Sequence, residues 1–254
     1  PIFVFNALNW ERSDIVEAPL PAQMKVAGVA DAFGNDMPYE IVGPPARRRV
    51  RFLARNVPGI GYRVFRLLDK ASADAEPPQL LASETKLENR WLRVEFDKQG
   101  LIRSIFDKDA GREIVPKGAR ANVFEIFEDK PAKWDAWDID SYYIDKGETV
   151  SQLESISVAS AGPLEAAVRI KRIVGASRIE QIVALGAESR KIEFRTSVDW
   201  REKERLLKVA FPTAINIGAP ARATFEIQYG HVERPTHWNT SWDRARFETC
   251  AHKW

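Results

Sequence analysis

Apolar and polar residues alternate along much of the chain with a period of two. In KIEFRTSVDW (191–200), every second residue is apolar or a threonine, and the residues between them are polar or charged. The same alternation runs through 91–97, 167–173 and 223–229. A period of two predicts β-strands, and strands with one polar face are typical of antiparallel sheets. Because no stretch keeps an apolar 3.6-residue period for three turns, we predict an all-β protein built as antiparallel β-sandwiches.

Turn-forming residues separate the predicted strands. AFGNDMP (32–38) predicts a hairpin loop that joins strands near 24–30 and 39–42. Further along, two turns rich in Asp and Gly flank a short strand, IRSIF (102–106). The regular spacing of strands and turns supports a sandwich rather than a helical fold.

Two segments are ambiguous. SDIVEA (13–18) is short enough to hold a single helical turn. DRARFETCAHKW (243–254) has apolar or small residues at alternate positions, and this pattern favours a strand.

One stretch without a period indicates a domain boundary. DKASADAEPPQLLASE (69–84) is rich in Ala, Ser, Asp and Pro and follows the strand GYRVFRLL (61–68). Such composition is typical of connections between domains. We therefore expect a small β-sandwich domain over 1–75, a linker over 76–84 and a larger β-sandwich over 85–254.

The charges nearly cancel, with 38 Lys and Arg against 36 Asp and Glu. The densest basic run, ARRRVRFLAR (46–55), alternates arginines with Val50 and Phe52, as a strand with one solvated face does. We expect no nucleic acid partner. We also expect no membrane association, since no apolar run reaches the roughly 18–20 residues that span a bilayer. Cys250 is the only cysteine, which excludes an intrachain disulfide and fits a reducing, cytoplasmic compartment.

The stretch PAKWDAWDIDSYYID (131–145) carries the densest candidate chemistry. An indole stacks on the apolar face of a sugar, and a neighbouring carboxylate accepts hydrogen bonds from vicinal hydroxyls. The candidate sugar-binding residues are therefore Trp134, Asp135, Trp137 and Asp138. The alternative is a packed corner, in which the indoles lie in the core and the aspartates cap turns.

The same segment also offers a pair of carboxylates. Glycosidases hold two carboxylates about 5–5.5 Å apart for retention or about 6.5–9.5 Å apart for inversion. On an extended strand, Asp138 and Asp140 would share a face about 6.6 Å apart. A catalytic pair is geometrically compatible with that arrangement.

A second dense stretch, ERPTHWNTSWDRARF (233–247), interleaves aromatic and polar residues as a binding loop does. Packed tryptophans with a surface Asp243–Arg244 pair are the alternative. A metal site is disfavoured, because His231, His237 and His252 lack HxH or HxxxH spacing. Nucleotide-binding glycine motifs and a GxSxG elbow are absent from the sequence.

Four segments together resemble the C-terminal β region of the family 38 glycoside hydrolases, the α-mannosidases. VFNALNWERSDIVEAPL (4–20) is similar to the opening of that region, and LENRWLRVEFDKQGLIRSIFDKDAGREIV (87–115) is similar to its most characteristic run. WDAWDID (134–140) and HWNTSWDRARFETCAHKW (237–254) resemble the subset of cytosolic-type and bacterial enzymes. The resemblance covers nearly the whole chain.

This resemblance implies a function in a larger enzyme. Family members are zinc-dependent retaining exo-α-mannosidases that hydrolyse terminal α-linked mannose from oligosaccharides. In them, an N-terminal α/β barrel carries the nucleophile and the zinc ligands. A helical bundle and β domains follow, the larger of which is similar to galactose mutarotase. The barrel motifs are absent from this sequence, so we assign no catalytic residue and no metal ligand here and expect the chain alone to be inactive.

Several expectations follow from placing the chain beside a missing barrel. The partners would be mannosides and the N-terminal catalytic barrel of the same chain, with zinc as the cofactor of the parent enzyme. The residues from Trp134 to Asp138 would shape or face the sugar pocket. A truncated mutarotase-like supersandwich would expose edges that drive homo-oligomerisation. A stand-alone carbohydrate-binding module remains an alternative. So does a mutarotase-like epimerase, for which Glu226 and His231 are on neighbouring strand positions, although the mutarotase pattern around them is absent.

Overall fold

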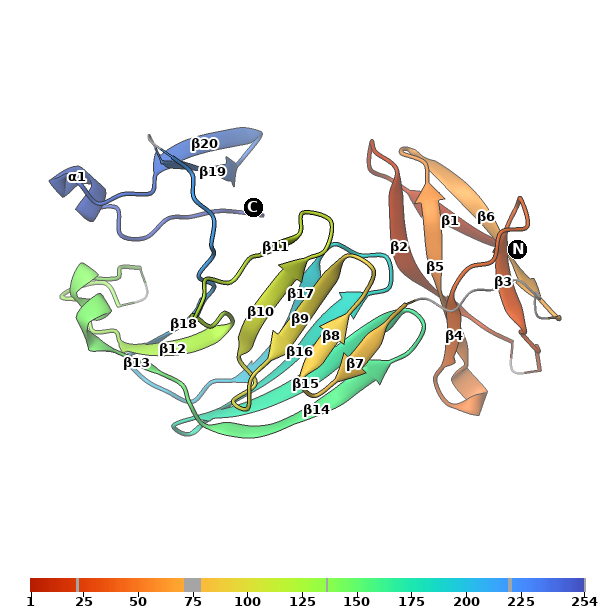
Figure 1. Ribbon diagram of the computed structural model, residues 1–254, viewed down its shortest axis with the longest axis horizontal. Coiled ribbons are helices and arrows are strands. Elements are labelled where there is room, and N and C mark those ends of the chain that lie inside the picture. Colours follow the sequence, from red (N-terminus) through yellow and green to blue (C-terminus); the bar gives the residue numbers. More distant parts are fainter. Residues whose placement is uncertain (22, 71–78, 136, 219–220, 254) are drawn as a thin grey trace.

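The computed structural model describes residues 1–21, 23–70, 79–135, 137–218 and 221–253. All the strand pairs in these ranges are antiparallel, and the only helical elements are short (Figure 1). The predicted all-β, antiparallel fold is therefore confirmed. In the described ranges, no helix combines the length and apolarity needed to cross a lipid bilayer.

The N-terminal unit is a sandwich of two three-stranded sheets. The first sheet has the order β1 (Ile2–Asn6), β6 (Gly61–Leu68), β3 (Gly28–Asp31), and the second has the order β2 (Arg12–Pro19), β5 (Arg49–Val57), β4 (Tyr39–Val42). A short 3-10 turn, η1 (Pro45–Arg47), precedes β5. Phe52 of β5 and Phe65 of β6 are fully buried between the sheets, with ring centroids 5.0 Å apart. Alternating apolar residues on both strands thus form one core.

Two expectations for this unit are wrong. The strands at 28–31 and 39–42 do not form a hairpin, because β3 pairs with β6 and β4 pairs with β5. The loop between them crosses from one sheet to the other. Residues 13–18 belong to β2 rather than to a helical turn. Pairing with the central strand β5 supplies their backbone hydrogen bonds and overrides the weak local helical pattern.

The larger unit contains two sheets that pack face to face, in front of and behind each other in Figure 1. One sheet has the order β11 (Arg112–Glu113), β10 (Ile102–Asp107), β9 (Leu92–Phe96), β8 (Lys86–Glu88), β7 (Leu81–Ser83), and the other β14 (Leu153–Ala161), β15 (Glu165–Val174), β16 (Ser177–Gly186), β17 (Ile192–Asp199). Val94 and Ile102 from the first sheet meet Val168 and Leu185 from the second in one buried cluster. The alternation at 91–97 and 167–173 produces this core, as predicted.

A tight turn connects β9 to β10 in the larger unit. After β9, the Asp97 carboxylate accepts hydrogen bonds from the backbone N–H groups of Gln99 and Leu101, both at 3.0 Å. Gly100 has a φ of 68°, a left-handed conformation that glycine adopts without strain. The predicted strand at 102–106 follows directly as β10.

A third sheet and a separate hairpin complete the unit. The sheet has the order β13 (Gly147–Thr149), β12 (Val123–Glu128), β18 (Arg205–Ala210), and η2 (Ser141–Lys146) precedes β13. The hairpin consists of β19 (Arg222–Ile227) and β20 (Gly230–Pro235), followed by α1 (Ser241–Arg244). The strand expected at 243–254 is wrong. Residues 241–244 form α1, and 245–253 are irregular, because the Thr240–Asp243 capping box starts a helical turn there.

The expected linker lies partly outside the described residues. Residues 71–78 are among those that the structure does not describe, and β7 at Leu81–Ser83 falls within the segment 76–84. The buried cluster of the N-terminal unit draws on residues up to position 67, and that of the larger sandwich starts near position 80. The division into 1–75 and 85–254 stays a prediction.

Candidate functional site

Asp140 fastens the base of the tryptophan loop, which we define as residues 129–140. The Asp140 carboxylate accepts hydrogen bonds from the Ala132 N–H at 2.7 Å and from the Tyr142 hydroxyl at 2.8 Å. The same hydroxyl lies 2.6 Å from the Lys130 carbonyl oxygen. The backbone hydrogen bond from Ala132, followed by that from Tyr142, lowers the pKa of Asp140. The two ends of the loop are therefore tied together by an ionised carboxylate.

The tip of the loop is a tight turn. The backbone N–H groups of Trp137 and Asp138 both donate to the Trp134 carbonyl oxygen, at 2.7 and 3.0 Å. Trp134 has a φ of 63°, in the left-handed region that costs a bulky residue conformational energy. Asp138 accepts a hydrogen bond from the Ile139 N–H at 3.0 Å. These contacts hold the segment in a defined shape.

Both indoles at the tip face solvent. The exposed fraction is 72% for Trp134 and 92% for Trp137, and Asp135 and Asp138 are exposed as well. Trp134, Trp137 and Asp138 line one shallow depression. The alternative of a packed corner is therefore wrong for the two tryptophans. The structure brings the four predicted residues onto one loop tip.

The β-strand on which Asp138 and Asp140 would share a face is not present in the described residues of this segment. Asp138 and Asp140 lie outside the assigned β-strands, and the backbone N–H groups of Trp137 and Asp138 donate back to the Trp134 carbonyl oxygen. One oxygen of Asp140, Oδ2, accepts the hydrogen bonds from Ala132 and Tyr142 at the base of the loop.

The second dense stretch is organised around Asp243. Its carboxylate accepts from the Thr240 N–H at 3.0 Å and from the Thr240 hydroxyl at 2.8 Å, and it lies 3.3 Å from Nδ1 of His237. The hydrogen bonds from Thr240 lower the pKa of Asp243. The expected Asp243–Arg244 pair is therefore not what holds this carboxylate. Trp238 and Trp242 remain 53% and 76% exposed, so they are not packed as the alternative supposed.

The histidines do not assemble a reactive centre. Across the described ranges, no three His, Cys, Asp or Glu side chains form a group suited to a metal ion. Glu226 and His231 pair across the β19–β20 hairpin, which forms a two-stranded sheet in the described ranges. Glu226 also accepts a hydrogen bond from the Lys253 N–H at 3.0 Å. The epimerase alternative stays a prediction.

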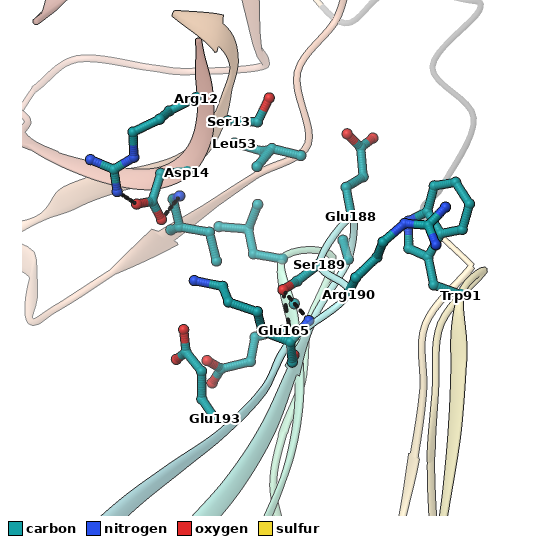
Figure 2. A pocket seen from close by; sticks show the side chains of 15 residues that line it. Arg12, Ser13, Asp14, Leu53, Trp91, Glu165, Glu188, Ser189, Arg190 and Glu193 are labelled. Carbon is teal, nitrogen blue, oxygen red and sulfur yellow. Dashed lines mark hydrogen bonds and ion pairs between the residues drawn. The ribbon is translucent and has the colours of Figure 1, made fainter. Parts of the chain in front are cut away.

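Sequence reasoning missed a groove of about 380 Å³ between the two sandwiches (Figure 2). Its walls come from β2, β5 and the ends of β15, β16 and β17. No local pattern signals it, because the segments are far apart in the sequence. Arg55 of β5 donates to both carboxylate oxygens of Glu188 beside the groove.

Several charged side chains of the groove form ion pairs, either within the groove or with residues beside it. Arg12 contacts Asp14 at 2.7 Å, and Glu165 is bound by Arg195 at 2.7 Å. Trp91 lies between the guanidinium groups of Arg90 and Arg190, which are 3.9 and 3.8 Å from its ring centroid. Because guanidinium groups occupy its ring faces, Trp91 offers no free platform for a sugar. The groove is better described as a domain contact than as a binding site.

Comparison with known proteins identifies the family. The profile of the glycosyl hydrolases family 38 C-terminal domain matches residues 87–254. The chain belongs to glycoside hydrolase family 38. It is 32% identical to Alpha-mannosidase 2C1 of Homo sapiens over all of this chain, and 32% identical to Alpha-mannosidase G of Dictyostelium discoideum. The chain spans 22% and 24% of the length of these two relatives.

Solved structures of family 38 share the fold. A family 38 protein from Enterococcus faecalis aligns with a TM-score of 0.68 and 17% identity, over 92% of this chain and 35% of that one. An α-mannosidase from Enterococcus faecalis V583 aligns with a TM-score of 0.65 and 15% identity, over 95% of this chain and 34% of that one. These two alignments show that the chain shares its fold with part of each of these two proteins.

Proposed function

We propose that this chain is the C-terminal β region of a zinc-dependent retaining α-mannosidase that hydrolyses terminal α-linked mannose from oligosaccharides. Membership of family 38 and the names of the full-coverage relatives support this proposal. The catalytic carboxylates would lie in an N-terminal barrel, since the chain spans 22% of the length of the human relative. A cytoplasmic location is part of the proposal and fits a chain with one cysteine.

The ligands of the proposed zinc ion would lie in the N-terminal barrel. Among the residues that the structure describes, His, Cys, Asp and Glu do not gather in a ligand set. We therefore derive no step of the reaction through zinc from the side chains of this chain. Its proposed contribution is to hold and shape the substrate.

The exposure of the two indoles carries the proposal for substrate binding. Burying large aromatic side chains is favourable, so leaving Trp134 and Trp137 in water on a fixed turn costs stability that a ligand contact would recover. Each indole would stack on the C–H face of a mannose ring. Asp135 and Asp138 would accept hydrogen bonds from its hydroxyls. The left-handed backbone of Trp134 is consistent with strain retained at a functional site.

Trp137→Ala and Asp138→Ala in the full-length enzyme test this role. We expect kcat/KM on a mannoside to fall at least tenfold, which corresponds to about 1.4 kcal/mol. Phe33→Ala is the matched control, because Phe33 is also an exposed aromatic residue, at 80%, but lies in the N-terminal unit. A loss below tenfold in stably folded variants would refute the role of the tryptophan loop.

The same exposure also fits a stand-alone carbohydrate-binding module. A module of that kind would bind glycans without the rest of the parent chain, through Trp134 and Trp137 alone. A glycan array probed with the purified 254-residue chain separates the two functions. Binding that Trp137→Ala abolishes would favour the module, whereas no binding favours a loop that acts only beside the catalytic barrel.

A further inference from the structure

Three polar side chains from distant segments meet below the tryptophan loop. The Tyr143 hydroxyl of η2 donates to the Glu248 carboxylate, and the Lys208 ammonium of β18 donates both to that carboxylate and to the Tyr143 oxygen. The Lys208 ammonium also lies 4.7 Å from the centroid of the Tyr143 ring. We name this group the Tyr143–Lys208–Glu248 clamp. It connects a 3-10 turn, a sheet strand and the irregular segment after α1.

The tyrosine at its centre is held from several sides. Tyr143 is 4% exposed, and its ring packs edge-on against Phe127 of β12, with centroids 5.1 Å apart. Phe247 covers it at 6.2 Å. Burial and the hydrogen bond to Glu248 raise the pKa of Tyr143, although Lys208 opposes this shift. The hydroxyl therefore keeps its proton at neutral pH and remains a donor to the carboxylate.

Both ends of the tryptophan loop emerge from elements that the clamp joins. The loop begins directly after β12, where Glu125 pairs in register with Lys208 of β18. It ends at Asp140, and η2 with Tyr143 starts at the next residue. A displacement of η2 would move Tyr142. Its hydroxyl is within hydrogen-bond distance of the Lys130 carbonyl oxygen and the Asp140 carboxylate at the base of the loop.

Glu248 connects the clamp to the β19–β20 hairpin. Glu248 lies in the segment 245–253, and at the end of that segment the Lys253 N–H donates to the Glu226 side chain at 3.0 Å. In Figure 1, the hairpin and α1 lie at the same end of the molecule as η2. The segment 245–253 thus links the hairpin to the turn that carries Tyr143.

We propose that the clamp positions the tryptophan loop, with Lys208 and Glu248 as positioning residues that act through Tyr143. Charge-assisted hydrogen bonds in a partly buried site are stronger than neutral ones, so loss of either charge releases η2 from β18. The consequence for catalysis rests on the proposed function of the loop. Correct placement of the indoles would lower KM for the mannoside and leave the bond-breaking step unchanged.

Hydrogen exchange in the full-length enzyme tests the clamp. Lys208→Met and Glu248→Gln each keep much of the side-chain volume but remove the charge. We expect the amide exchange rates of residues 130–147 and 245–253 to rise about tenfold, because local opening becomes easier. The mannoside KM should rise about tenfold while kcat stays within about twofold.

Two further variants separate positioning from general destabilisation. Asp199→Asn removes the exposed Asp199–Arg201 ion pair at the end of β17 and should leave exchange at 130–147 unchanged. The charge-swapped double variant, Lys208→Glu with Glu248→Lys, keeps an ion pair around the Tyr143 hydroxyl. It should restore at least half of the lost protection.

Unchanged exchange at 130–147 in Lys208→Met and Glu248→Gln would overturn the clamp. Raised exchange without a change in KM, when Trp137→Ala does raise KM, would overturn its positioning role while the proposed function stands. If Trp137→Ala is itself without effect, raised exchange keeps the clamp and removes the sugar-binding role of the loop instead.

Discussion

The Arg55 guanidinium donates to both oxygens of the Glu188 carboxylate, and this pair joins β5 of the N-terminal sandwich to the turn after β16 of the larger one. A third donor of Arg55 reaches the Asp36 carbonyl oxygen at 3.2 Å. Bidentate arginine–carboxylate contacts of this kind fix the relative orientation of the two side chains as well as the distance between them.

Arg55→Met should therefore loosen the contact between the two sandwiches. Both side chains are about one-third exposed, at 32% and 30%, so solvent weakens the pair and we expect a coupling energy of about 0.5–1.5 kcal/mol. A double-mutant cycle with Glu188→Gln, followed by urea unfolding, measures it. The coupling should shrink in 1 M salt. Full additivity at low salt would show that the pair contributes nothing.

Leu185→Ala should destabilise the larger sandwich strongly. Leu185 of β16 is fully buried in the cluster between the two sheets, and truncation leaves a cavity that costs about 2–5 kcal/mol. Leu81→Ala is the matched control, because Leu81 on β7 is 42% exposed and should cost less than about 0.5 kcal/mol. Equal losses for the two variants in chemical denaturation would contradict the assigned core.

Arg172→Met should leave stability unchanged or increase it. Arg172 on β15 is 2% exposed, and burial lowers the pKa of its guanidinium. One nitrogen donates to the Gln99 carbonyl oxygen at 2.6 Å, but no acceptor among the described residues contacts Nε or Nη1. Replacing a poorly paired buried charge by an apolar side chain of similar length typically gains about 1–4 kcal/mol or is neutral. A loss above about 2 kcal/mol in urea unfolding would refute this account.

Asp31→Asn should reduce the acid sensitivity of the N-terminal sandwich. Burial alone would raise the pKa of Asp31, but hydrogen bonds from Asn35 and from the Phe33 N–H outweigh it and lower the pKa below its ordinary 3.8. The carboxylate therefore stabilises the fold above pH 3.8, and this contribution is lost as the pH falls through the lowered value. The stability gap between wild type and Asp31→Asn should be about 1–3 kcal/mol at pH 7 and should close on acidification. A stability difference between wild type and Asp31→Asn that is independent of pH would contradict this prediction.

The 254-residue chain should self-associate when it is produced alone. Large apolar side chains remain 37–58% exposed along and after β17 and β18, among them Trp200, Phe211 and Ile215. Association of two copies would remove such exposed apolar side chains from water, which is favourable. Light scattering should detect dimers or larger species, and Trp200→Lys with Phe211→Lys should reduce them. A clean monomer of the unmodified chain at high concentration would contradict this prediction.

The strands were predictable where one face of the sheet is buried. The alternation around Val94 and Val168 gives the core strands of the larger sandwich directly, because burial of every second residue leaves a period of two in the sequence. The pattern also overstates burial in 191–200. Ile192 and Phe194 pack against the core, but Val198 and Trp200 on the same alternation lie 42% and 37% exposed.

Strand pairing was not predictable at the same level. The apparent hairpin around 32–38 has suitable turn residues, yet its flanking strands join different sheets. Turn chemistry reports the local reversal of the chain and not the partner of each strand. After residue 240, a local signal did decide the structure. An N-terminal capping box there prevailed over a weak alternation of apolar and polar residues.

The sequence-based choice of site residues stays a prediction, and the contacts that hold their loop were not predictable from the sequence. Trp134 and Trp137 were evident from residue type, and their exposure required the structure. The clamp was invisible in the sequence, because Tyr143, Lys208 and Glu248 are separated by 65 and 40 positions. Contacts over such separations leave no periodic signal.

The interleaved strands of the N-terminal unit affect how the chain acquires its structure. The sheet of β14, β15, β16 and β17 is built from successive hairpins. Each strand therefore pairs with its nearest neighbours in the sequence. In the N-terminal sandwich, by contrast, β1 must wait for β6, about sixty residues away, before its sheet begins. Since loop closure over long separations slows the search, the four-stranded meander should acquire its native contacts early in refolding and the N-terminal sandwich late.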